Sequence, residues 1–311
     1  MQKRIIASTL IFFSLFITSV SFSQGRNRIK TIIVDAGHGG SDQGAKGDYS
    51  TEAQITLKLS MKVAALLEKE LPQTKILQNR TTDIFNNVKE KAAFANENKG
   101  DLFICIHVNA APAIRHSQIT GYRNKTYYTG KGSKRKKHTK KEPVYKVWFT
   151  PNPRSGTGTY VWAADRGQAK ENAVSERFES TEEVADAPDP NSPELAVISR
   201  LWVQKYFKNS VRLASMIEDE FVKIGRKSDG VLQRNEKGIW VLQATNMPAV
   251  LIETGFITNK EEEDYLNSEK GQEEMTQAIV NAIISFKNLL DGTRGAPADA
   301  AATETGGSKK K

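Results

Sequence analysis

The chain has 311 residues and a formal net charge of +9, from 45 Lys and Arg against 36 Asp and Glu. Its single cysteine, Cys105, excludes an internal disulfide, so the fold must depend on its hydrophobic core, on a bound metal or on both. The basic balance alone would admit a nucleic-acid-binding protein, but the excess charge is concentrated in one segment, residues 123–146.

The first residues have the pattern of a cleavable export signal. Lys3 and Arg4 precede an apolar run over residues 5–20, and residues 21–23 supply small side chains at the positions that a signal peptidase reads. The run is short for a bilayer span and has no charged flank after it, which disfavours a retained membrane anchor. No cysteine follows it to carry a lipid. We therefore expect residues 1–23 to be removed and the mature protein to be exported, either periplasmic or secreted.

Between this signal and a Gly-, Ala-, Thr- and Lys-rich tail, residues 291–311, about 265 residues remain. Apolar strand-like runs alternate with helical stretches, which is typical of an α/β sheet. The expected strands cover residues 29–34, 75–77, 102–108, 158–162 and 249–252, and the expected helices cover residues 55–71, 88–98, 199–224 and 271–290. We interpret residues 29–290 as one domain with insertions at about 112–156 and 171–198, although the length alone would admit two domains.

His38 follows the first strand. Residues 32–40, Ile-Ile-Val-Asp-Ala-Gly-His-Gly-Gly, run from an apolar strand into a glycine turn. This puts His38 just beyond the carboxyl end of a strand, where open α/β sheets place their sites. The glycines let the backbone approach a ligand closely. A His that merely fills a turn is the alternative when this motif is taken alone.

Glu52 begins the next helix. Thr51 and Gln54 have the spacing of a capping box, which puts Glu52 in the first turn. Its face of the helix must pack on the sheet, and a carboxylate there is costly without a cationic partner. The other residues of this face are Ile55, Leu59, Val63 and Leu66. The alternative is an acid that the helix N-terminus favours, by up to about 1 kcal/mol.

His107 interrupts the apolar strand 102–108 near its carboxyl end, and an imidazole buried there needs a partner. Strand alternation puts Cys105 on the same face but deeper in the sheet, so we interpret Cys105 as a core residue. His138 falls in the basic segment and His116 just after the strand. His38 and His107 are therefore the natural pair.

The basic segment, residues 123–146, carries ten Lys or Arg against Glu142 alone, with Gly and Ser between them. This composition predicts a solvated loop. Contact with anionic sugars at the cell surface is the alternative. Nucleic acid is disfavoured, because an exported protein rarely meets it and no stacking pattern accompanies the charges beyond Tyr122, Tyr127 and Tyr128.

A second polar segment, residues 171–194, is acidic and ends in a Pro-rich stretch, residues 188–193. We expect an insertion with a helix at its start. Its acidic residues are Glu171, Glu176, Glu179, Glu182, Glu183, Asp186, Asp189 and Glu194.

Two His and one Glu are a typical set for a catalytic zinc ion with its fourth position open, whereas structural zinc sites are closed and usually rich in Cys. Such an ion lowers the pKa of water toward ~7 and polarises a carbonyl. The chemistry also needs a proton carrier. Glu253 follows the apolar strand 249–252 at the same edge of the sheet, and it could act as general base and then general acid. A carboxylate held by backbone donors or an Arg is the alternative.

Taken together, these motifs resemble the zinc-dependent N-acetylmuramoyl-L-alanine amidases that split daughter-cell walls, the type 3 amidase family. The resemblance rests on four motifs in family order: residues 34–40, Glu52 at a helix start, residues 106–110 (Ile-His-Val-Asn-Ala) and residues 250–259 (Val-Leu-Ile-Glu-Thr-Gly-Phe-Ile-Thr-Asn). Residues 156–161 and 171–173 resemble the next strand and helix of the family. The resemblance implies that His38, Glu52 and His107 bind zinc and that Glu253 is the catalytic acid/base.

The resemblance also implies a fold and an activity. The fold is a single α/β domain with a twisted, mixed and mostly parallel sheet flanked by helices on both faces. The activity is hydrolysis of the amide bond between N-acetylmuramic acid and L-alanine in peptidoglycan, which releases stem peptides during wall remodelling and daughter-cell separation. The basic stretch after His107 is longer than the family pattern.

Some members of the family carry an inserted helix that covers the zinc until a partner removes it. The acidic stretch 176–194 falls at the corresponding place. We therefore hypothesise that one of its carboxylates occupies the open zinc position until an activator protein displaces it. A solvated insertion without a regulatory role is the alternative.

Two other functions stay open. A zinc peptidase acting within wall peptides would use the same four residues, and only the family resemblance separates it from an amidase. A non-catalytic peptidoglycan-binding protein is disfavoured, because it has no use for a strand-end Glu beside an open metal site. We expect no nucleic-acid partner and no stable membrane anchor.

Overall fold

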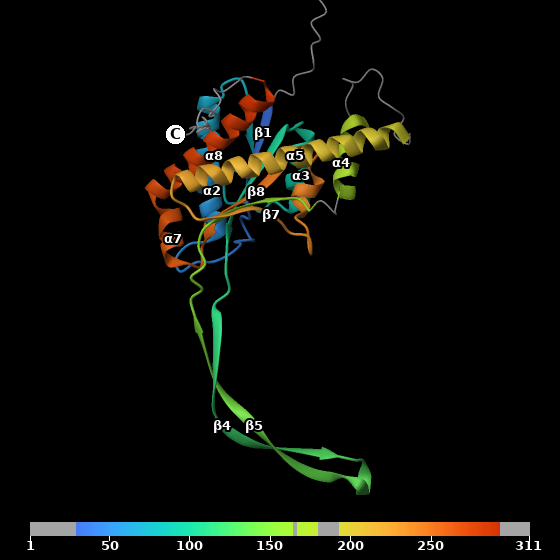
Figure 1. The fold of residues 1–311 in the computed structure, drawn as a ribbon, viewed down its shortest axis with the longest axis vertical. Coiled ribbons are helices and arrows are strands. Elements are labelled where there is room, and N and C mark those ends of the chain that lie inside the picture. Colours follow the sequence, from blue (N-terminus) through green and yellow to red (C-terminus); the bar gives the residue numbers. More distant parts are fainter. Residues whose placement is uncertain (1–28, 164–166, 180–192, 293–311) are drawn as a thin grey trace, which may run out of the picture. The chain divides into compact units, whose positions relative to one another are not determined.

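The computed structural model describes residues 29–163, 167–179 and 193–292 (Figure 1). The predicted export signal, residues 1–23, and nearly all of the predicted tail lie outside these residues. The chain divides into two compact units. Residues 30–284 hold both sheets, while the described part of the other unit is Ile29 with the end of the last helix, where the Lys287 ammonium donates to the Ile29 carbonyl at 2.9 Å. No helix among the described residues is both long and apolar enough to cross a membrane.

A six-stranded sheet forms the centre of residues 30–284, in the order β2-β1-β3-β8-β6-β7. All neighbouring strands are parallel except β6 and β8, which are antiparallel, so the sheet is mixed and mostly parallel, as predicted. The strands are β1 (Thr31–Ala36), β2 (Lys75–Gln78), β3 (Leu102–Asn109), β6 (Thr157–Val161), β7 (Ser228–Gln233) and β8 (Ala249–Phe256).

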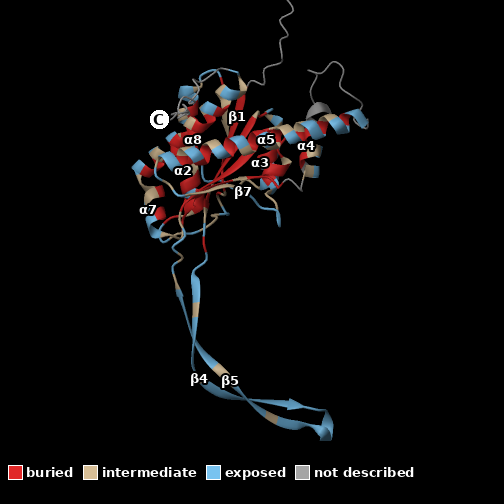
Figure 2. Cartoon of the chain, viewed as in Figure 1, coloured by how far each residue is buried: buried red, intermediate tan, exposed pale blue. Residues whose placement is uncertain are grey.

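Helices cover both faces of this sheet, and every residue of β1 and β8 is buried (Figure 2). On one face, strand residues such as Ile33, Phe103 and Leu251 form a core cluster with α3, α4, α5 and α6. Helix α2 packs against β1, β2 and β3. The helices are α2 (Glu52–Glu70), α3 (Val88–Glu97), α4 (Gly167–Glu179), α5 (Pro193–Lys223), α6 (Trp240–Ala244), α7 (Lys260–Asn267) and α8 (Glu269–Leu290).

Helix α2 starts where the capping box predicted. Thr51 has an extended backbone, and its N–H donates to Gln54 Oε1 at 3.2 Å. Ile55 and Leu59 are fully buried, so the apolar face of the helix lies on the sheet and carries Glu52 with it.

The basic segment is a hairpin and not the predicted loop. Strands β4 (Ile114–Thr129) and β5 (Lys136–Thr150) pair antiparallel and are joined through a 3-10 turn, η1 (Gly132–Lys134). Its residues are largely exposed, as Figure 2 shows, but they are not irregular. The reason is that aromatic and β-branched residues favour extended backbone, while a ribbon with both faces in water needs no apolar alternation. The loop prediction was therefore wrong.

The acidic segment begins with a helix, as predicted. Helix α4 is joined to α5 by a contact between Ser175 Oγ and Ser199 Oγ at 3.0 Å, and the Glu171 carboxylate lies 3.8 Å from the Arg200 guanidinium. Residues 180–192, which hold half of the acids named above, lie outside the described residues.

Candidate metal centre

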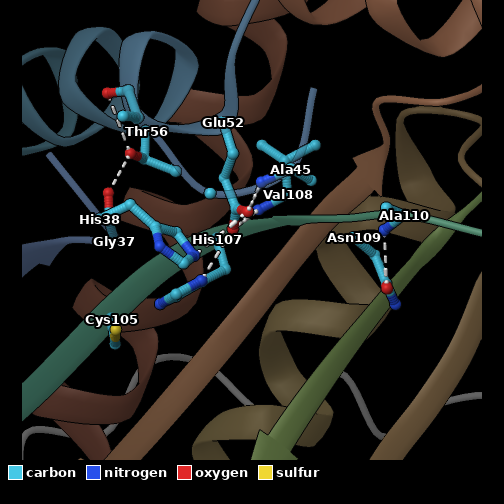
Figure 3. A network of polar contacts seen from close by, with 12 residues as sticks. Gly37, His38, Ala45, Glu52, Thr56, Cys105, His107, Val108, Asn109 and Ala110 are labelled. Atoms are coloured by element: carbon cyan, nitrogen blue, oxygen red, sulfur yellow. Dashed lines mark hydrogen bonds and ion pairs between the residues drawn. The ribbon is translucent and has the colours of Figure 1, made fainter. Parts of the chain in front are cut away.

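Three elements bring His38, Glu52 and His107 together (Figure 3). His38 lies two residues beyond β1, His107 lies near the carboxyl end of the neighbouring strand β3, and Glu52 is the first residue of α2. Candidate ligand atoms of the three side chains all lie within 4.8 Å of one another. The sequence placed these residues at one edge of the sheet, and the structure brings them together there.

Glu52 stands between the two imidazoles. Its Oε2 lies 3.2 Å from His38 Nε2 and its Oε1 lies 2.8 Å from His107 Nδ1. The backbone N–H groups of Ala45 and Val108 also donate to its two oxygens, at 2.9 and 3.1 Å. Glu52 is only 4% exposed, so its charge is buried but fully satisfied by these donors.

Glu52 and His38 stabilise each other's charged forms. Burial alone would raise the pKa of Glu52, but the hydrogen bonds and charges of His107 and His38 hold it well below its usual range. Burial would likewise lower the pKa of His38, yet Glu52 and Asp42 raise it to about 9. A concentration of negative charge that holds protons this strongly also suits a divalent cation.

Asp42 orients His38, and the sequence reading missed it. The Asp42 carboxylate lies 2.8 Å from His38 Nδ1, so a neutral ring that donates Nδ1–H there keeps Nε2 free toward Glu52. Reciprocal backbone hydrogen bonds between Gly39 and Asp42, 2.7 and 3.1 Å long, fold the chain back to make this contact. Gly39 and Gly40 could have indicated this contact in the sequence. They form a tight turn, after which the chain folds back so that Asp42, four residues after His38, faces the histidine ring.

Glycine is required on both sides of the cluster. A Cβ on Gly37 would stand 2.7 Å from the His107 ring, and one on Gly44 would stand 2.6 Å from both the Glu52 carboxylate and the His38 ring. His38 itself has φ of 57°, which is uncommon for a residue with a side chain. The surrounding contacts therefore impose this conformation on the histidine.

Glu253 is the fourth predicted residue, and it lies in the middle of β8 opposite His107 in β3. It is 8% exposed, and its Oε2 has no hydrogen-bond partner among the described residues. Burial, helped by the charge of Glu52, raises its pKa to about 7, against the opposing charges of His107, Arg234 and His38. The alternative of a carboxylate satisfied by backbone donors does not hold for Oε2, which is an orphaned buried oxygen on the strand next to the cluster.

Arg80 fixes the two backbone segments that carry the cluster. Its guanidinium donates to the carbonyls of Ala36 and Gly37, just before His38, at 3.2 and 2.9 Å. It also donates to the carbonyl of Ala53, just after Glu52, at 2.9 Å. A buried cation thus ties the β1 turn to the start of α2, and sequence reasoning did not identify it.

Cys105 is a core residue, as predicted. Its thiol is buried in the core cluster and donates to Asp35 Oδ2 at 2.8 Å, and Asp35 Oδ1 pairs with the Lys91 ammonium at 2.9 Å. Burial raises the pKa of the thiol well above its usual value, so it stays protonated. It is not part of the candidate metal cluster.

The other two histidines lie in the hairpin. His116 stacks on Trp148 with ring centroids 5.3 Å apart, and His138 stacks on Tyr127 at 5.1 Å. Neither belongs to the cluster of possible metal ligands, which contains His38 and His107.

The fold and the site together define a class of protein. The chain is an α/β domain with two His and one Glu at the carboxyl edge of its sheet and a buried carboxylate on the next strand. This is the arrangement of a metal-dependent hydrolase. The profile of the N-acetylmuramoyl-L-alanine amidase family matches residues 32–285. The chain therefore belongs to this family, as the motifs indicated.

Individual relatives agree with this assignment. The chain is 25% identical over 263 residues to N-acetylmuramoyl-L-alanine amidase AmiC of Escherichia coli O6:H1, covering 84% of this chain and 54% of AmiC. It is 26% identical over 285 residues to AmiA of Salmonella typhimurium, covering 88% and 84%. It is also 28% identical over 257 residues to the uncharacterized protein YqiI of Bacillus subtilis, covering 83% and 84%, a likeness that does not bear on the activity. The chain thus spans about half the length of AmiC and most of the other two.

A solved structure supports the fold. The N-acetylmuramoyl-L-alanine amidase from Clostridium difficile 630 aligns with a TM-score of 0.53 and 22% identity, over 83% of this chain and 97% of that one. This likeness confirms the predicted fold class.

Proposed function

We propose that this protein is a zinc-dependent amidase that hydrolyses the bond between N-acetylmuramic acid and L-alanine in peptidoglycan. His38, Glu52 and His107 would hold the zinc, and Glu253 would carry the proton. The observation that carries the proposal is the convergence of these three donors, a nitrogen and carboxylate set without thiolates, which suits a catalytic rather than a structural zinc. The choice of bond rests on the family match and the names of the relatives.

When bound, zinc supplies a Lewis acid that polarises the scissile carbonyl and lowers the pKa of water. The protein fixes the ligands in advance: Asp42 holds the His38 ring, and two backbone N–H groups hold the Glu52 carboxylate. Such a frame keeps the site from rearranging as charge develops on the carbonyl oxygen.

Glu253 is suited to move the proton. A carboxyl with a pKa of about 7 is present in both forms near neutral pH, so it can accept a proton from the attacking water and then donate it to the departing amine of L-alanine. The orphaned Oε2 is the oxygen that has no competing hydrogen bond among the described residues.

Mass spectrometry of purified peptidoglycan digested by the zinc-loaded protein tests the proposal. Stem peptides with a free L-alanine amine are expected from the wild type and not from Glu253→Gln. Glu261→Gln, an exposed acid replaced in the same way, is the control and should digest normally. Peptides cut internally would favour the peptidase alternative, and intact peptidoglycan under every condition would favour a binding protein.

We propose further that the acidic insertion regulates this site. The support is its position between α4 and α5, at the place where the family resemblance puts an inserted helix. Deleting residues 175–193 should raise activity, because the carboxylate that competes for the open zinc position is gone. A replacement of the same length by Gly and Ser controls for chain connectivity, and unchanged or lower activity in both would contradict the idea.

We also propose that the protein is exported. The sequence of residues 1–23 supports removal of a signal, which N-terminal sequencing of the protein secreted by its host would test. A protein that keeps Met1 would contradict it.

A further inference from the structure

We define the basic arm as residues 114–150, which comprise β4, β5 and their turn. It carries 11 Lys and Arg against one Glu, a net charge of +10, so all other residues of the chain together carry −1. The basic excess of the protein therefore lies in this one hairpin. Charge of a single sign at this density attracts a polymer of the opposite sign.

Most cations of the basic arm are not paired with an acid within the described residues. Glu142, the only acid of the arm, pairs with Lys125 at 3.1 Å and with Arg123 at 3.8 Å. None of the other nine cations pairs with a carboxylate in the parts of the chain that the structure describes. Arg135 instead lies over the Tyr128 ring, 4.2 Å from its centroid.

Apolar side chains form an exposed row on one face of the basic arm. Tyr145, Val147 and Phe149 are alternate residues of β5 and so share a face. On β4, Ile119 lies opposite Tyr145. Tyr122 lies opposite Pro143, the next residue on this face of β5 toward the turn. All five are exposed, Tyr122 to 67% and Phe149 to 62%. Apolar groups left exposed in a contiguous row mark a surface that binds something.

The apolar row lies on the part of the basic arm toward the domain, while cations occur along the whole arm and at its turn. The turn and the residues beside it, 130–137, read Gly-Lys-Gly-Ser-Lys-Arg-Lys-Lys and hold no apolar side chain. A segment that enters a bilayer interface needs an apolar face to bury there, which this turn lacks. Tyr127 and Tyr128 lie beside the turn, but His138 stacks on Tyr127 and the Arg135 guanidinium lies over the Tyr128 ring. Cations along the whole arm therefore suit a polyanion lying along it better than a lipid surface at its end.

The segments that flank the basic arm are held at the edge of the sheet that carries the candidate metal centre. Three residues before the arm, the Ala111 N–H donates to Thr258 Oγ1 at 3.0 Å. Four residues after it, the Asn259 amide donates to the Arg154 carbonyl at 3.3 Å. Thr258 and Asn259 lie within three residues of the end of β8, and Ala111 lies two residues beyond β3; these strands carry Glu253 and His107. A polymer bound to the arm is thereby tethered to the site.

We propose that the basic arm binds the glycan strands of peptidoglycan and holds them at the metal centre, an inference that takes the identity of the polymer from the proposed function. Sugar rings stack on the exposed aromatic and aliphatic row, and the carboxylates of the stem peptides pair with the cations. The arm of another copy is a poor partner, because each arm carries the same strong positive charge.

Co-sedimentation with insoluble purified peptidoglycan tests the proposal, using the zinc-loaded full chain with Glu253→Gln as a common background to prevent cleavage. The arm variant replaces Lys134, Lys136, Lys137 and Lys140 with Gln. The control variant makes the same charge change at exposed positions of the domain, Lys58, Lys69, Lys89 and Lys208. The arm variant should bind about tenfold more weakly at low salt, whereas the control should bind like its parent. High salt should remove the difference, because it screens exposed charges.

A second variant tests the row of rings without changing charge. Tyr122→Ala with Tyr145→Ala should weaken sedimentation at both salt concentrations, since stacking is not screened. Equal binding by the arm and control variants would overturn the inference. So would an arm variant that loses binding to anionic phospholipid vesicles or to single-stranded DNA but sediments normally with peptidoglycan. Sedimentation is independent of cleavage, so a protein that binds through the arm but releases no stem peptides would overturn the proposed amidase activity and leave this inference standing.

Discussion

Glu253 lies directly opposite His107 on the neighbouring parallel strand, in a register that continues down the buried parts of β3 and β8. The register shifts only beyond this pair, between His107 and Asn109. The spacing between the proposed proton carrier and one proposed zinc ligand is thus set by the sheet and not by a loop. A site built this way depends on the core for its precision.

Replacing Glu253 with Gln should stabilise the metal-free protein relative to the wild type, and by more as the pH rises. Burial raises the pKa of Glu253 from 4.5 to about 7, so between these values the folded protein keeps a proton that the unfolded chain has lost. Wild-type stability should therefore fall as pH rises through this window, by ~3 kcal/mol in total, and the variant should lack this fall. Urea unfolding in the presence of a chelator, at about pH 5 and about pH 8, measures it. A difference between the two proteins that does not change with pH would refute the assignment.

Asp42→Asn should weaken zinc binding by about 10- to 100-fold, because a neutral amide holds the His38 Nδ1–H less firmly and no longer raises the basicity of the ring. Competition with a coloured zinc chelator measures the affinity. Asp48→Asn removes an exposed acid from the same loop and should leave the affinity unchanged. If the two variants bind zinc equally well, Asp42 does not orient the ligand.

Arg80→Lys should lower both stability and zinc affinity. A lysine cannot reach the carbonyls of Gly37 and Ala53 together, so buried acceptors are left without partners at a cost of about 1–3 kcal/mol. The segments that carry His38 and Glu52 would then be less firmly joined. Thermal unfolding with and without zinc separates the two effects, and Arg212→Lys on the exposed face of α5 is the control. Normal zinc affinity in Arg80→Lys would show that the clamp is structural only.

Much of the fold could be predicted because its strands are buried on both faces and so appear as continuous apolar runs, as in β3 and β8. The missing elements lack that signal. Strand β7, Ser228–Gln233, lies at the edge of the sheet with a Gly and polar residues. Strands β4 and β5 are paired in solvent, with no buried face that would require a continuous apolar run. Helix α5 begins at Pro193, before the predicted start at 199, because Pro is tolerated in the first turn of a helix. The predicted domain boundaries and insertions stay predictions.

The residues of the candidate site could be predicted because each of the four interrupts or ends an apolar pattern. A polar group in such a place is costly unless it has a partner. Asp42 and Arg80 could not be found this way, since an acid and a basic residue in polar loops have no pattern to break. Their roles depend on the turn that returns Asp42 to His38 and on the depth at which Arg80 is buried. Both are properties of the folded chain and not of its periodicity.

Zinc titration of the chelator-stripped protein, followed by the appearance of new L-alanine amino groups in peptidoglycan, tests whether zinc at this cluster is required for amide hydrolysis. We expect no activity without metal and a rise to a plateau at about one zinc per chain. Glu52→Gln, which removes the carboxylate that faces both histidines, should have no activity at the same zinc concentration. Full activity in the stripped protein, or in Glu52→Gln at one zinc per chain, would contradict this requirement.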